Sequence, residues 1–468
     1  MPRMPRMSGR RTRRVLALAA ALAIPVGLAP AASAHDGHHA SQADVRSGYY
    51  TQWSAYSGFT IKSVIDNGDA AHLNEINYAF INVAPETTGK LAGTDQYVPV
   101  ANTPIECRSV DPWADYQMPF GGTSGRPSVD GTADDWSGLQ GNFKQILELK
   151  KKYPNIKVIA SLGGFTLSDW FSDASLTKQS RDHLVQSCVD MLIKGNLPGL
   201  PAGAAKGVFD GIDIDWEYPG APGDHATTLP PVAGPTARTE DTANFTALMA
   251  DFRSQLDAVS HSQHSQRYLL TAALSANPSK IGLLQVKKLN NSLDQFNVMD
   301  YDFHGPWEAT GPTDFQSNLF NSAASPQPAN NQFSIDTSIN TFLNAGADRK
   351  KLIVGVPFYG HGWTGVQDGG THGLYQPATG PTADGGTANW NVISKLGYQP
   401  YRDPITGGYW VYDPTSTNLY VVDDPTEIVQ KMHYITKRDL GGAFYWSLDG
   451  DDSAGSLGAA VDFGLAGR

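Results

Sequence analysis

The chain has 468 residues, of which 17% are charged and 10% are aromatic, and its formal net charge is −11 at pH 7. This composition indicates a packed protein with one large domain or a few ordinary ones, and excludes a disordered chain. The N-terminal segment holds six arginines and no acids, so removing those six positive charges from −11 leaves −17 on the remainder. Such an acidic body argues against nucleic acid and membrane surfaces as partners and suits a neutral or cationic ligand.

The first 34 residues have the three parts of a secretory signal peptide. Arginines up to Arg14 are followed by an apolar run from Val15 to Leu28 and then by Ala32-Ser-Ala, which predicts cleavage before His35. The apolar run is shorter than the ~20 residues that a membrane-spanning helix needs. We therefore expect residues 1–34 to be removed from a secreted, extracellular protein. Residues 35–46 should form a flexible lead-in, which we prefer to a metal site for the histidines that they contain.

Short runs rich in β-branched and aromatic residues recur through the rest of the chain, separated by helix-like segments. This alternation is typical of right-handed crossover units with a parallel sheet. The expected strands are 47–56, 75–84, 157–162, 208–219, 268–275, 295–299, 352–357 and 442–447, and the expected helices are 141–153, 177–195, 242–261, 334–345 and 426–437. Eight such units predict the α/β class and a (β/α)8 TIM barrel over residues 47–468, with its chemistry at the carboxyl ends of the strands.

One segment, residues 363–424, breaks this alternation. It contains no long helical pattern, but many turn signals and short β-like runs such as Gly408-Tyr-Trp-Val-Tyr. We predict a small α+β insertion domain after the seventh barrel strand, which would deepen one wall of a cleft.

The fourth expected strand carries a row of acids in the sequence D-G-I-D-I-D-W-E, which begins at Asp210. Because strand side chains alternate, Asp213, Asp215 and Glu217 should share one face of the strand. Carboxylates roughly 6 to 7 Å apart in a poorly hydrated cleft cannot all be charged, so at least one pKa must rise. Glu217 would lie nearest the barrel mouth, and we predict that it is the general acid. Asp210 has the opposite parity and is predicted to be a structural hydrogen-bonding residue.

The pattern Asp-x-x-Asp-x-Asp-x-Glu resembles the signature of glycoside hydrolase family 18, the chitinases and their relatives. Further motifs fit the same family: Ser161-Leu-Gly-Gly, Met299-Asp-Tyr-Asp, Tyr359-Gly-His-Gly-Trp and Gly441-Gly-Ala-Phe-Tyr-Trp. The resemblance runs from about Gly48 to the end of the chain, and the insertion points to bacterial chitinases with an α+β insertion. The chain departs from the family at Phe165, where tryptophan is common, and at His361, where arginine is usual.

The resemblance implies that the substrate supplies the nucleophile. The 2-acetamido oxygen of the sugar would attack its own anomeric carbon, and water would open the resulting oxazolinium ion with retention of configuration. Asp215 would hold the acetamido N–H, Asp213 would share a proton with Asp215, and Tyr301 would donate a hydrogen bond to the acetamido oxygen. These three residues and Glu217 are the predicted catalytic set.

The resemblance also implies a substrate-binding set, in which flat aromatic rings stack on the apolar faces of the sugars. Trp446 would form the floor under the cleaved sugar, Trp53 would lie on the glycone side and Trp307 on the aglycone side. Asp302 would accept a hydrogen bond from a sugar hydroxyl. The complete predicted set is Trp53, Phe165, Met299, Asp302, Trp307, Tyr359 and Trp446.

The sequence therefore predicts a secreted, monomeric chitinase that binds chitin or chitooligosaccharides and uses no metal and no cofactor. Two alternatives stay open at this point. An endo-β-N-acetylglucosaminidase acting on N-glycans shares the acidic row, and a non-catalytic chitin-binding lectin shares the fold, although such lectins generally lack the glutamate present here as Glu217. Export would also allow Cys107 and Cys188 to form a disulfide, but their spacing does not decide whether they pair.

Overall fold

The computed structural model describes residues 45–85, 88–90, 97–99, 103–223 and 237–467. The predicted signal peptide lies outside these residues, as does the predicted lead-in up to residue 44. The strands are β1 (Val45–Thr51), β2 (Glu75–Pro85), β3 (Thr88–Lys90), β4 (Tyr97–Pro99), β5 (Ile105–Ser109), β6 (Lys157–Gly163), β7 (Gly211–Asp215), β8 (Leu269–Ser275), β9 (Gln295–Met299), β10 (Leu352–Pro357), β11 (Tyr359–Thr364), β12 (Gly380–Pro381), β13 (Thr387–Asn389), β14 (Gln399–Asp403), β15 (Gly408–Asp413), β16 (Asn418–Val421) and β17 (Gly442–Trp446).

The α-helices are α1 (Ile61–Asp66), α2 (Gly141–Lys152), α3 (Phe171–Ser175), α4 (Lys178–Cys188), α5 (Asp241–Gln263), α6 (Pro278–Ile281), α7 (Val286–Leu289), α8 (Ile335–Asn344), α9 (Trp390–Ile393), α10 (Pro425–Arg438) and α11 (Ser456–Leu465). The five longer helices predicted from the sequence agree with α2, α4, α5, α8 and α10. The helix predicted to run to residue 195 continues past α4 as a π-helical turn, η4 (Val189–Ile193).

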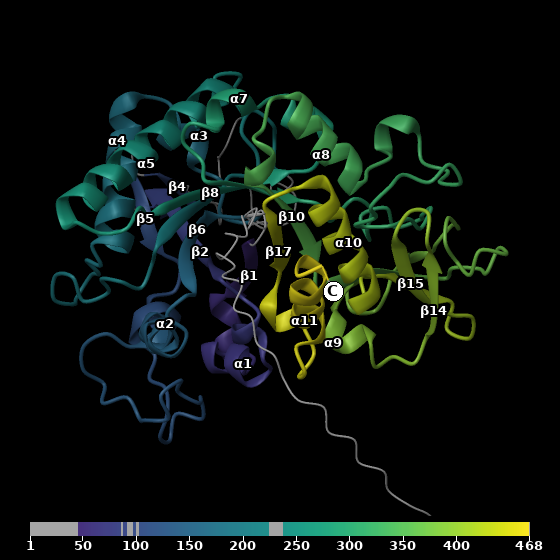
Figure 1. Cartoon of the computed structure of the whole chain (residues 1–468), viewed down its shortest axis with the longest axis horizontal. Coiled ribbons are helices and arrows are strands. Elements are labelled where there is room, and N and C mark those ends of the chain that lie inside the picture. Colours follow the sequence, from purple (N-terminus) through teal and green to yellow (C-terminus); the bar gives the residue numbers. More distant parts are fainter. Residues whose placement is uncertain (1–44, 86–87, 91–96, 100–102, 224–236, 468) are drawn as a thin grey trace, which may run out of the picture. The chain divides into compact units, whose positions relative to one another are not determined.

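Eight parallel strands form a closed barrel, with the helices packed around it (Figure 1). The strand order is β1-β17-β10-β9-β8-β7-β6-β2, and β1 pairs with β2 to close the ring. The antiparallel strand β5 pairs with residues 81–85, at the carboxyl-terminal end of β2. The predicted TIM barrel is therefore confirmed, and it places the carboxyl ends of all eight strands at one mouth.

The first strand is shorter than predicted. It ends at Thr51, and the next five residues form a 3₁₀-helix, η1 (Gln52–Tyr56). The Ser54 hydroxyl donates to the Thr51 carbonyl at 2.7 Å, and the Ser57 N–H donates to the Ser54 carbonyl at 3.0 Å. These local hydrogen bonds replace strand pairing, a competition that serine commonly provokes. Trp53 consequently stands on a turn at the barrel mouth.

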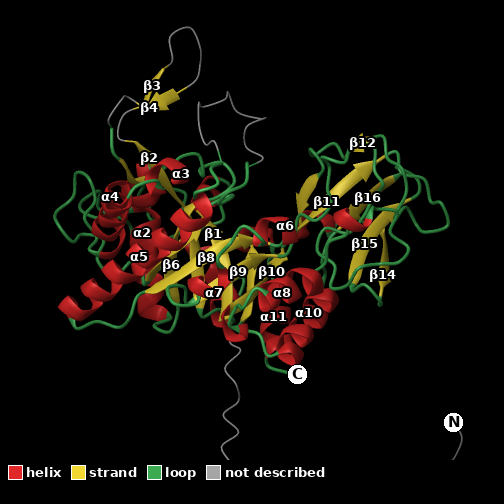
Figure 2. Ribbon diagram, turned by 90° about the horizontal axis from the view of Figure 1, so that it is seen from above, coloured by secondary structure: helices red, strands yellow, loops and turns green. Residues whose placement is uncertain are grey.

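A second, antiparallel sheet carries the segment predicted as an insertion (Figure 2). Its strands follow the order β12-β11-β16-β15-β14, and β13 also pairs with β11. The sheet has its own hydrophobic cluster, which includes Trp363, Trp410, Tyr412 and Leu419. Because β11 follows β10 after a single residue, this sheet starts directly beside the barrel mouth.

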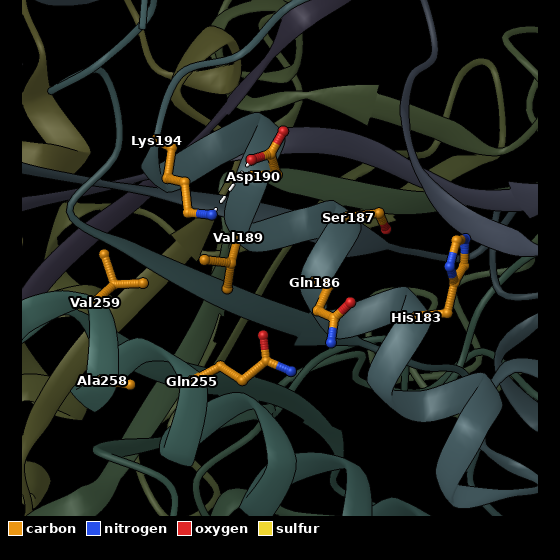
Figure 3. A pocket seen from close by; sticks show the side chains of 9 residues that line it. All are labelled: His183, Gln186, Ser187, Val189, Asp190, Lys194, Gln255, Ala258 and Val259. Carbon is orange, nitrogen blue, oxygen red and sulfur yellow. Dashed lines mark hydrogen bonds and ion pairs between the residues drawn. The ribbon is translucent and has the colours of Figure 1, made fainter.

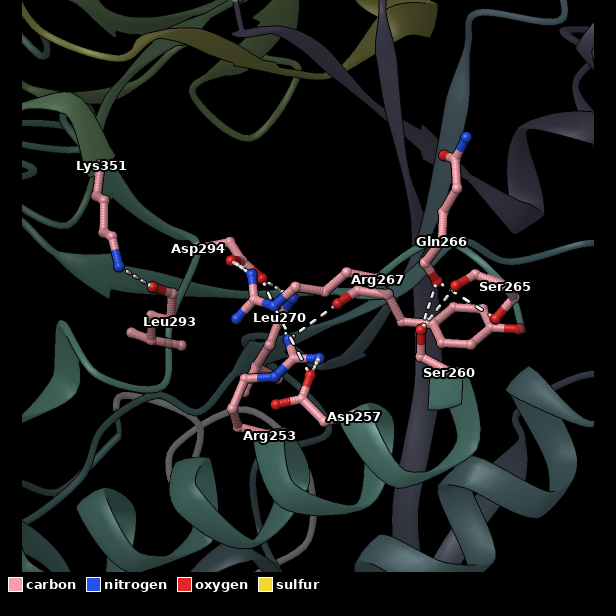
Figure 4. A network of polar contacts seen from close by, with 11 residues as sticks. Arg253, Asp257, Ser260, Ser265, Gln266, Arg267, Leu270, Leu293, Asp294 and Lys351 are labelled. Atoms are coloured by element: carbon pink, nitrogen blue, oxygen red, sulfur yellow. Dashed lines mark hydrogen bonds and ion pairs between the residues drawn. The ribbon is translucent and has the colours of Figure 1, made fainter. Parts of the chain in front are cut away.

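The opposite end of the barrel, at the amino ends of β8 and β9, is held by an ionic network (Figure 4). Asp294 accepts the Leu270 N–H at 2.9 Å and pairs with Arg253 and Arg267. Arg253 also donates to the Tyr268 carbonyl at 2.9 Å. Residues at this face of a TIM barrel contribute to stability rather than chemistry.

Asp210 and the two cysteines make structural contacts with other segments of the chain. Asp210 accepts hydrogen bonds from Lys150 Nζ at 2.6 Å and from the Val158 N–H at 2.8 Å, which confirms its structural role. Cys107 on β5 and Cys188 at the end of α4 form a disulfide, so the pairing that the sequence left open is made. It joins an added strand to a barrel helix.

Candidate active site

The carboxyl ends of the barrel strands open into a cleft of about 1140 Å³. Ten of the eleven predicted site residues line it: Trp53, Phe165, Asp215, Glu217, Met299, Tyr301, Asp302, Trp307, Tyr359 and Trp446. The eleventh, Asp213, lies deeper in the barrel and is fully buried. The structure thus brings the predicted residues together around one cavity, with Asp213 beneath it.

Asp213 is surrounded by hydrogen-bond donors from four other barrel strands. Tyr49 and Ser161 donate to Oδ2 at 2.9 and 2.7 Å, while Thr271 and Asn297 donate to Oδ1 at 2.6 and 3.4 Å. Burial raises the pKa of Asp213, and the hydrogen bonds oppose that rise because they favour the charged form. The barrel interior therefore fixes this carboxyl group in place.

Asp215, two residues further along β7, has a different environment. It is 4% exposed and lines the cleft, yet no described residue donates a hydrogen bond to its Oδ1. Burial, then the negative charges of Glu217 and Asp213, raise the pKa of Asp215 well above its ordinary value. The rise in pKa predicted from charge crowding in the acidic row is thus found at Asp215, whereas the rise at Asp213 comes from burial.

Glu217 lies just past the end of β7 and lines the cleft at partial exposure. Its backbone is held by the Ser168 hydroxyl group. The hydroxyl oxygen accepts a hydrogen bond from the Glu217 N–H at 3.0 Å, and the hydroxyl can donate to the Asp215 carbonyl oxygen, also at 3.0 Å. Between the acids, Trp216 points outward and stacks on Phe171 at 5.5 Å. The alternation of inward acids and outward apolar groups positions the row.

The two glycines at the end of β6, Gly163 and Gly164, are required by how tightly this strand end packs. Gly163 has φ +100°, and a Cβ there would lie 2.4 Å from the Asp215 carbonyl oxygen. Gly164 has φ +87°, and a Cβ there would lie 2.5 Å from the ring of Phe80. Positive φ and the absence of a side chain are both conditions that glycine meets best. Ser161-Leu-Gly-Gly therefore supplies a donor to Asp213 and space for two close contacts.

Tyr301 and Asp302, which also line the cleft, follow β9. Burial, and next the charge of Asp215, raise the pKa of Tyr301 well above its ordinary value, so its phenol stays a neutral donor. Asp302 adopts φ +58°, and its Oδ1 lies 2.6 Å from Tyr359 Oη and 2.7 Å from His361 Nε2. Both partners come from β11 of the second sheet, which thereby helps to shape the cleft.

Aromatic side chains form the floor and rim of the cleft. Trp446 at the end of β17 stacks on Phe80 with ring centroids 5.5 Å apart and also contacts Tyr49 and Trp53. Trp53, Phe165 and Trp307 are each about half exposed, at 47%, 48% and 58%. Large apolar rings that remain exposed in a cavity are available to a ligand.

Several lining residues were not predicted from the sequence. Phe80 lies in the middle of β2 (Glu75–Pro85), so a search of the strand ends would not have found it. Glu308 directly follows the predicted Trp307, but a lone glutamate in a loop gives no signal. Lys280 in the short helix α6 and Asn331 in a 3₁₀ turn reach the cleft only through the tertiary fold, so no local pattern could have indicated them.

In the part of the chain that the structure describes, no group of three or more His, Cys, Asp or Glu side chains could hold a metal ion. No helix within the described ranges is both long enough and apolar enough to cross a membrane. A second cavity of about 480 Å³ lies on the outer wall between α4, η4 and α5, where Lys194 pairs with Asp190 (Figure 3). Asp190 is the one acid among its described lining residues, and none of them is Trp, Tyr or Phe.

The fold and the site together define a barrel protein with a buried carboxylate row beneath an aromatic, ligand-sized cleft. The sequence profile described as Glycosyl hydrolases family 18 matches residues 45–451. The chain belongs to this family, whose signature motifs surround the cleft.

Several similar proteins are chitinases. The chain is 34% identical over 425 residues to Chitinase C of Streptomyces lividans, a match that covers 90% of this chain and 59% of that protein. The solved catalytic domain of the psychrophilic chitinase B from Arthrobacter TAD20 is 35% identical, with a TM-score of 0.78 and coverage of 92% of this chain and 96% of that one. A mutant of catalytic domain 2 of the Ostrinia furnacalis Group II chitinase, solved in complex with penta-N-acetylchitooctaose, is 25% identical with a TM-score of 0.67, and the match covers 90% of this chain and 96% of that one.

Proposed function

We propose that this protein is a secreted chitinase that hydrolyses the β-1,4 bonds between N-acetylglucosamine units with retention of configuration. Family membership and the names of its relatives support the substrate, and the predicted signal peptide supports secretion. The proposed partner is chitin or a chitooligosaccharide, bound by a monomer.

The observation that carries this proposal is the hydrogen-bonding environment of the Asp215 carboxylate. A buried carboxylate oxygen with no donor among the described residues is costly, since buried polar groups are normally hydrogen-bonded. The N–H of a 2-acetamido group would satisfy this oxygen, while Tyr301, just past the end of β9, would donate to the acetamido oxygen. An acetylated amino sugar therefore complements the site, whereas a plain hexose offers no such N–H.

The reaction would then proceed in two steps. In the first, Glu217 gives its proton to the glycosidic oxygen while the C1–O bond breaks and the acetamido oxygen bonds to C1. In the second, Glu217, now a carboxylate, takes a proton from water, which attacks C1 and opens the oxazolinium ring. Asp213 and Asp215 exchange a proton between them, because closely spaced buried carboxylates titrate as a unit.

A linear polymer is the proposed substrate because the exposed aromatic rings continue beyond the cleft. Trp113 and Trp136 are 41% and 70% exposed, with ring centroids 6.3 Å apart. Trp113 belongs to η3 (Trp113–Gln117), which packs against η1, the helix that carries Trp53. An extended chain that leaves the cleft past Trp53 would meet these rings next, and a branched N-glycan would have less use for them.

The test is the release of fluorophore from a chitobioside by the wild type and by Glu217→Gln. We expect the wild type to release fluorophore and the variant to lose at least 100-fold in kcat, the lower range for removal of a general acid. Binding of both proteins to chitin controls for folding. Two equally inert proteins that both bind chitin would overturn the enzymatic function in favour of a lectin.

A further inference from the structure

The cleft contains a carboxylate outside the catalytic row, next to its most exposed aromatic ring. Glu308 directly follows Trp307 in the loop after β9, and both line the cleft. The indole is 58% exposed, and the Glu308 side chain is 21% exposed. A sugar stacked on Trp307 would therefore lie within reach of a charged group.

The structure holds Glu308 in a defined position. The buried His304 ring places Nδ1 3.0 Å from Glu308 Oε2 and 3.2 Å from Oε1. Gln327 and Asn331 approach Oε1 at 3.5 and 3.4 Å, and Trp363 Nε1 donates to the Glu308 backbone carbonyl at 3.0 Å. Among the described residues, His304 is the one with a hydrogen bond to Oε2, which leaves that oxygen able to accept another donor.

The charges that line the cleft favour a cation. Two acids outside the catalytic row, Asp302 and Glu308, line the cleft, whereas Lys280 is the one lysine or arginine among its described lining residues. Lys280 Nζ lies 3.4 Å from the centroid of the Tyr218 ring, in a cation–π contact. A cleft lined mainly by one sign of charge concentrates ligands of the opposite sign.

The cationic form of this substrate is a sugar unit that has lost its acetyl group. Its ammonium group would form a charge-assisted hydrogen bond with a carboxylate, which is stronger than the bond from a neutral amide N–H. On the other side of the scissile bond the sugar must keep its acetyl group, because that group is the proposed nucleophile. The glycone side of the cleft thus requires an acetylated sugar, whereas the aglycone side would favour a deacetylated one.

We propose that Glu308, beside Trp307, is a specificity-determining residue that makes the aglycone side of the cleft accept glucosamine, so that partly deacetylated chitin is a preferred substrate. This inference rests on the proposed chitinase function. Cleavage would leave N-acetylglucosamine at every new reducing end and enrich glucosamine at the first two positions from the new non-reducing ends.

The test is the digestion of chitosan of about half acetylation, followed by tandem mass spectrometry of products labelled at their reducing ends. We expect the glucosamine-to-N-acetylglucosamine ratio at those two positions to fall about fivefold in Glu308→Gln. A fivefold change is the effect expected from the loss of one partly solvated ion pair. Glu240→Gln removes the same charge from an exposed residue at the start of α5 and should keep the wild-type ratio.

A second measurement uses the wild type alone, so it does not depend on the folding of a variant. Raising the salt concentration from 0.01 to 1 M should reduce the glucosamine enrichment, because salt screens a partly solvated ion pair. Enrichment that is absent from the wild type, or unaffected by both Glu308→Gln and salt, would overturn this inference while chitohexaose is still cleaved. Failure to cleave chitohexaose at all would instead overturn the proposed function.

Discussion

Replacing Asp213 with asparagine removes one charge from beneath the cleft and changes its shape very little. The four groups that donate to the carboxylate are hydroxyls and an amide from Tyr49, Ser161, Thr271 and Asn297. Hydroxyl groups can rotate to accept a hydrogen bond as well as donate one. The side-chain amide introduced at position 213 can therefore be accommodated, and the substitution mainly changes the electrostatics of the acidic row.

The magnitude follows from the spacing of the row. Same-face neighbours along a strand are roughly 6 to 7 Å apart, and two charges at that distance interact by about 2 kcal/mol at an effective dielectric constant near 20. The charge of Asp213 raises the pKa of Asp215, so its removal lowers that pKa. The shared proton of the row is then lost at a lower pH. We expect the alkaline limb of kcat/KM to move about one to two pH units toward acid.

The assay is the pH dependence of fluorophore release from a chitobioside, with thermal unfolding as a check on the fold. Asp210→Asn is the matched control, because it removes the same charge from the residue just before β7 at a position that contacts Lys150 and Val158 outside the cleft. It should leave the alkaline limb in place. An alkaline limb that stays fixed in Asp213→Asn would refute the coupling of the row.

Four further outcomes follow from other parts of the structure. Burial raises the pKa of Asp69 to about 7, so stability is lost as pH rises from about 4 to 7. Asp69→Asn should therefore add about 4 kcal/mol to the unfolding free energy at pH 8 but not at pH 4. Gly164→Ala should lower kcat/KM, since the new Cβ would push on an aromatic ring of the cleft floor, and normal kinetics would contradict that packing. The double variant Cys107→Ser and Cys188→Ser should lose about 2 to 4 kcal/mol in denaturant unfolding while keeping kcat/KM, because the disulfide closes a sequence separation of 81. Trp136→Ala should lower the hydrolysis of crystalline chitin more than that of a soluble chitobioside, and an equal loss on both would count against the extended binding path.

The barrel was predictable because its strands are buried on both faces, so they read as short apolar runs between helical segments. The second sheet was predictable for a different reason, because residues 363–424 lack helical periodicity. The end of β1 was missed because the residues after Thr51 have a composition typical of strands, while the Ser54 hydroxyl ends the strand locally. A side-chain hydrogen bond of this kind leaves no trace in a hydrophobic pattern.

In the site, parity along β7 placed the acids, but the surroundings of each acid required the structure. Asp302 is shaped by Tyr359 and His361, which come from another sheet. Glu308 is held by groups more than ten residues away as well as by its neighbour His304. The pairing of Cys107 with Cys188 likewise depends on how β5 and α4 pack. Contacts between distant segments are the part that no local pattern contains.

The most direct test of the central claim is the anomeric form of the first product released from chitohexaose, followed by proton NMR before mutarotation. If Asp215 holds the acetamido group so that its oxygen attacks the anomeric carbon, the initial product is the β-anomer. An initial α-anomer would show that water attacks the sugar directly, and would contradict the role given to Asp215, Tyr301 and the substrate's own acetyl group.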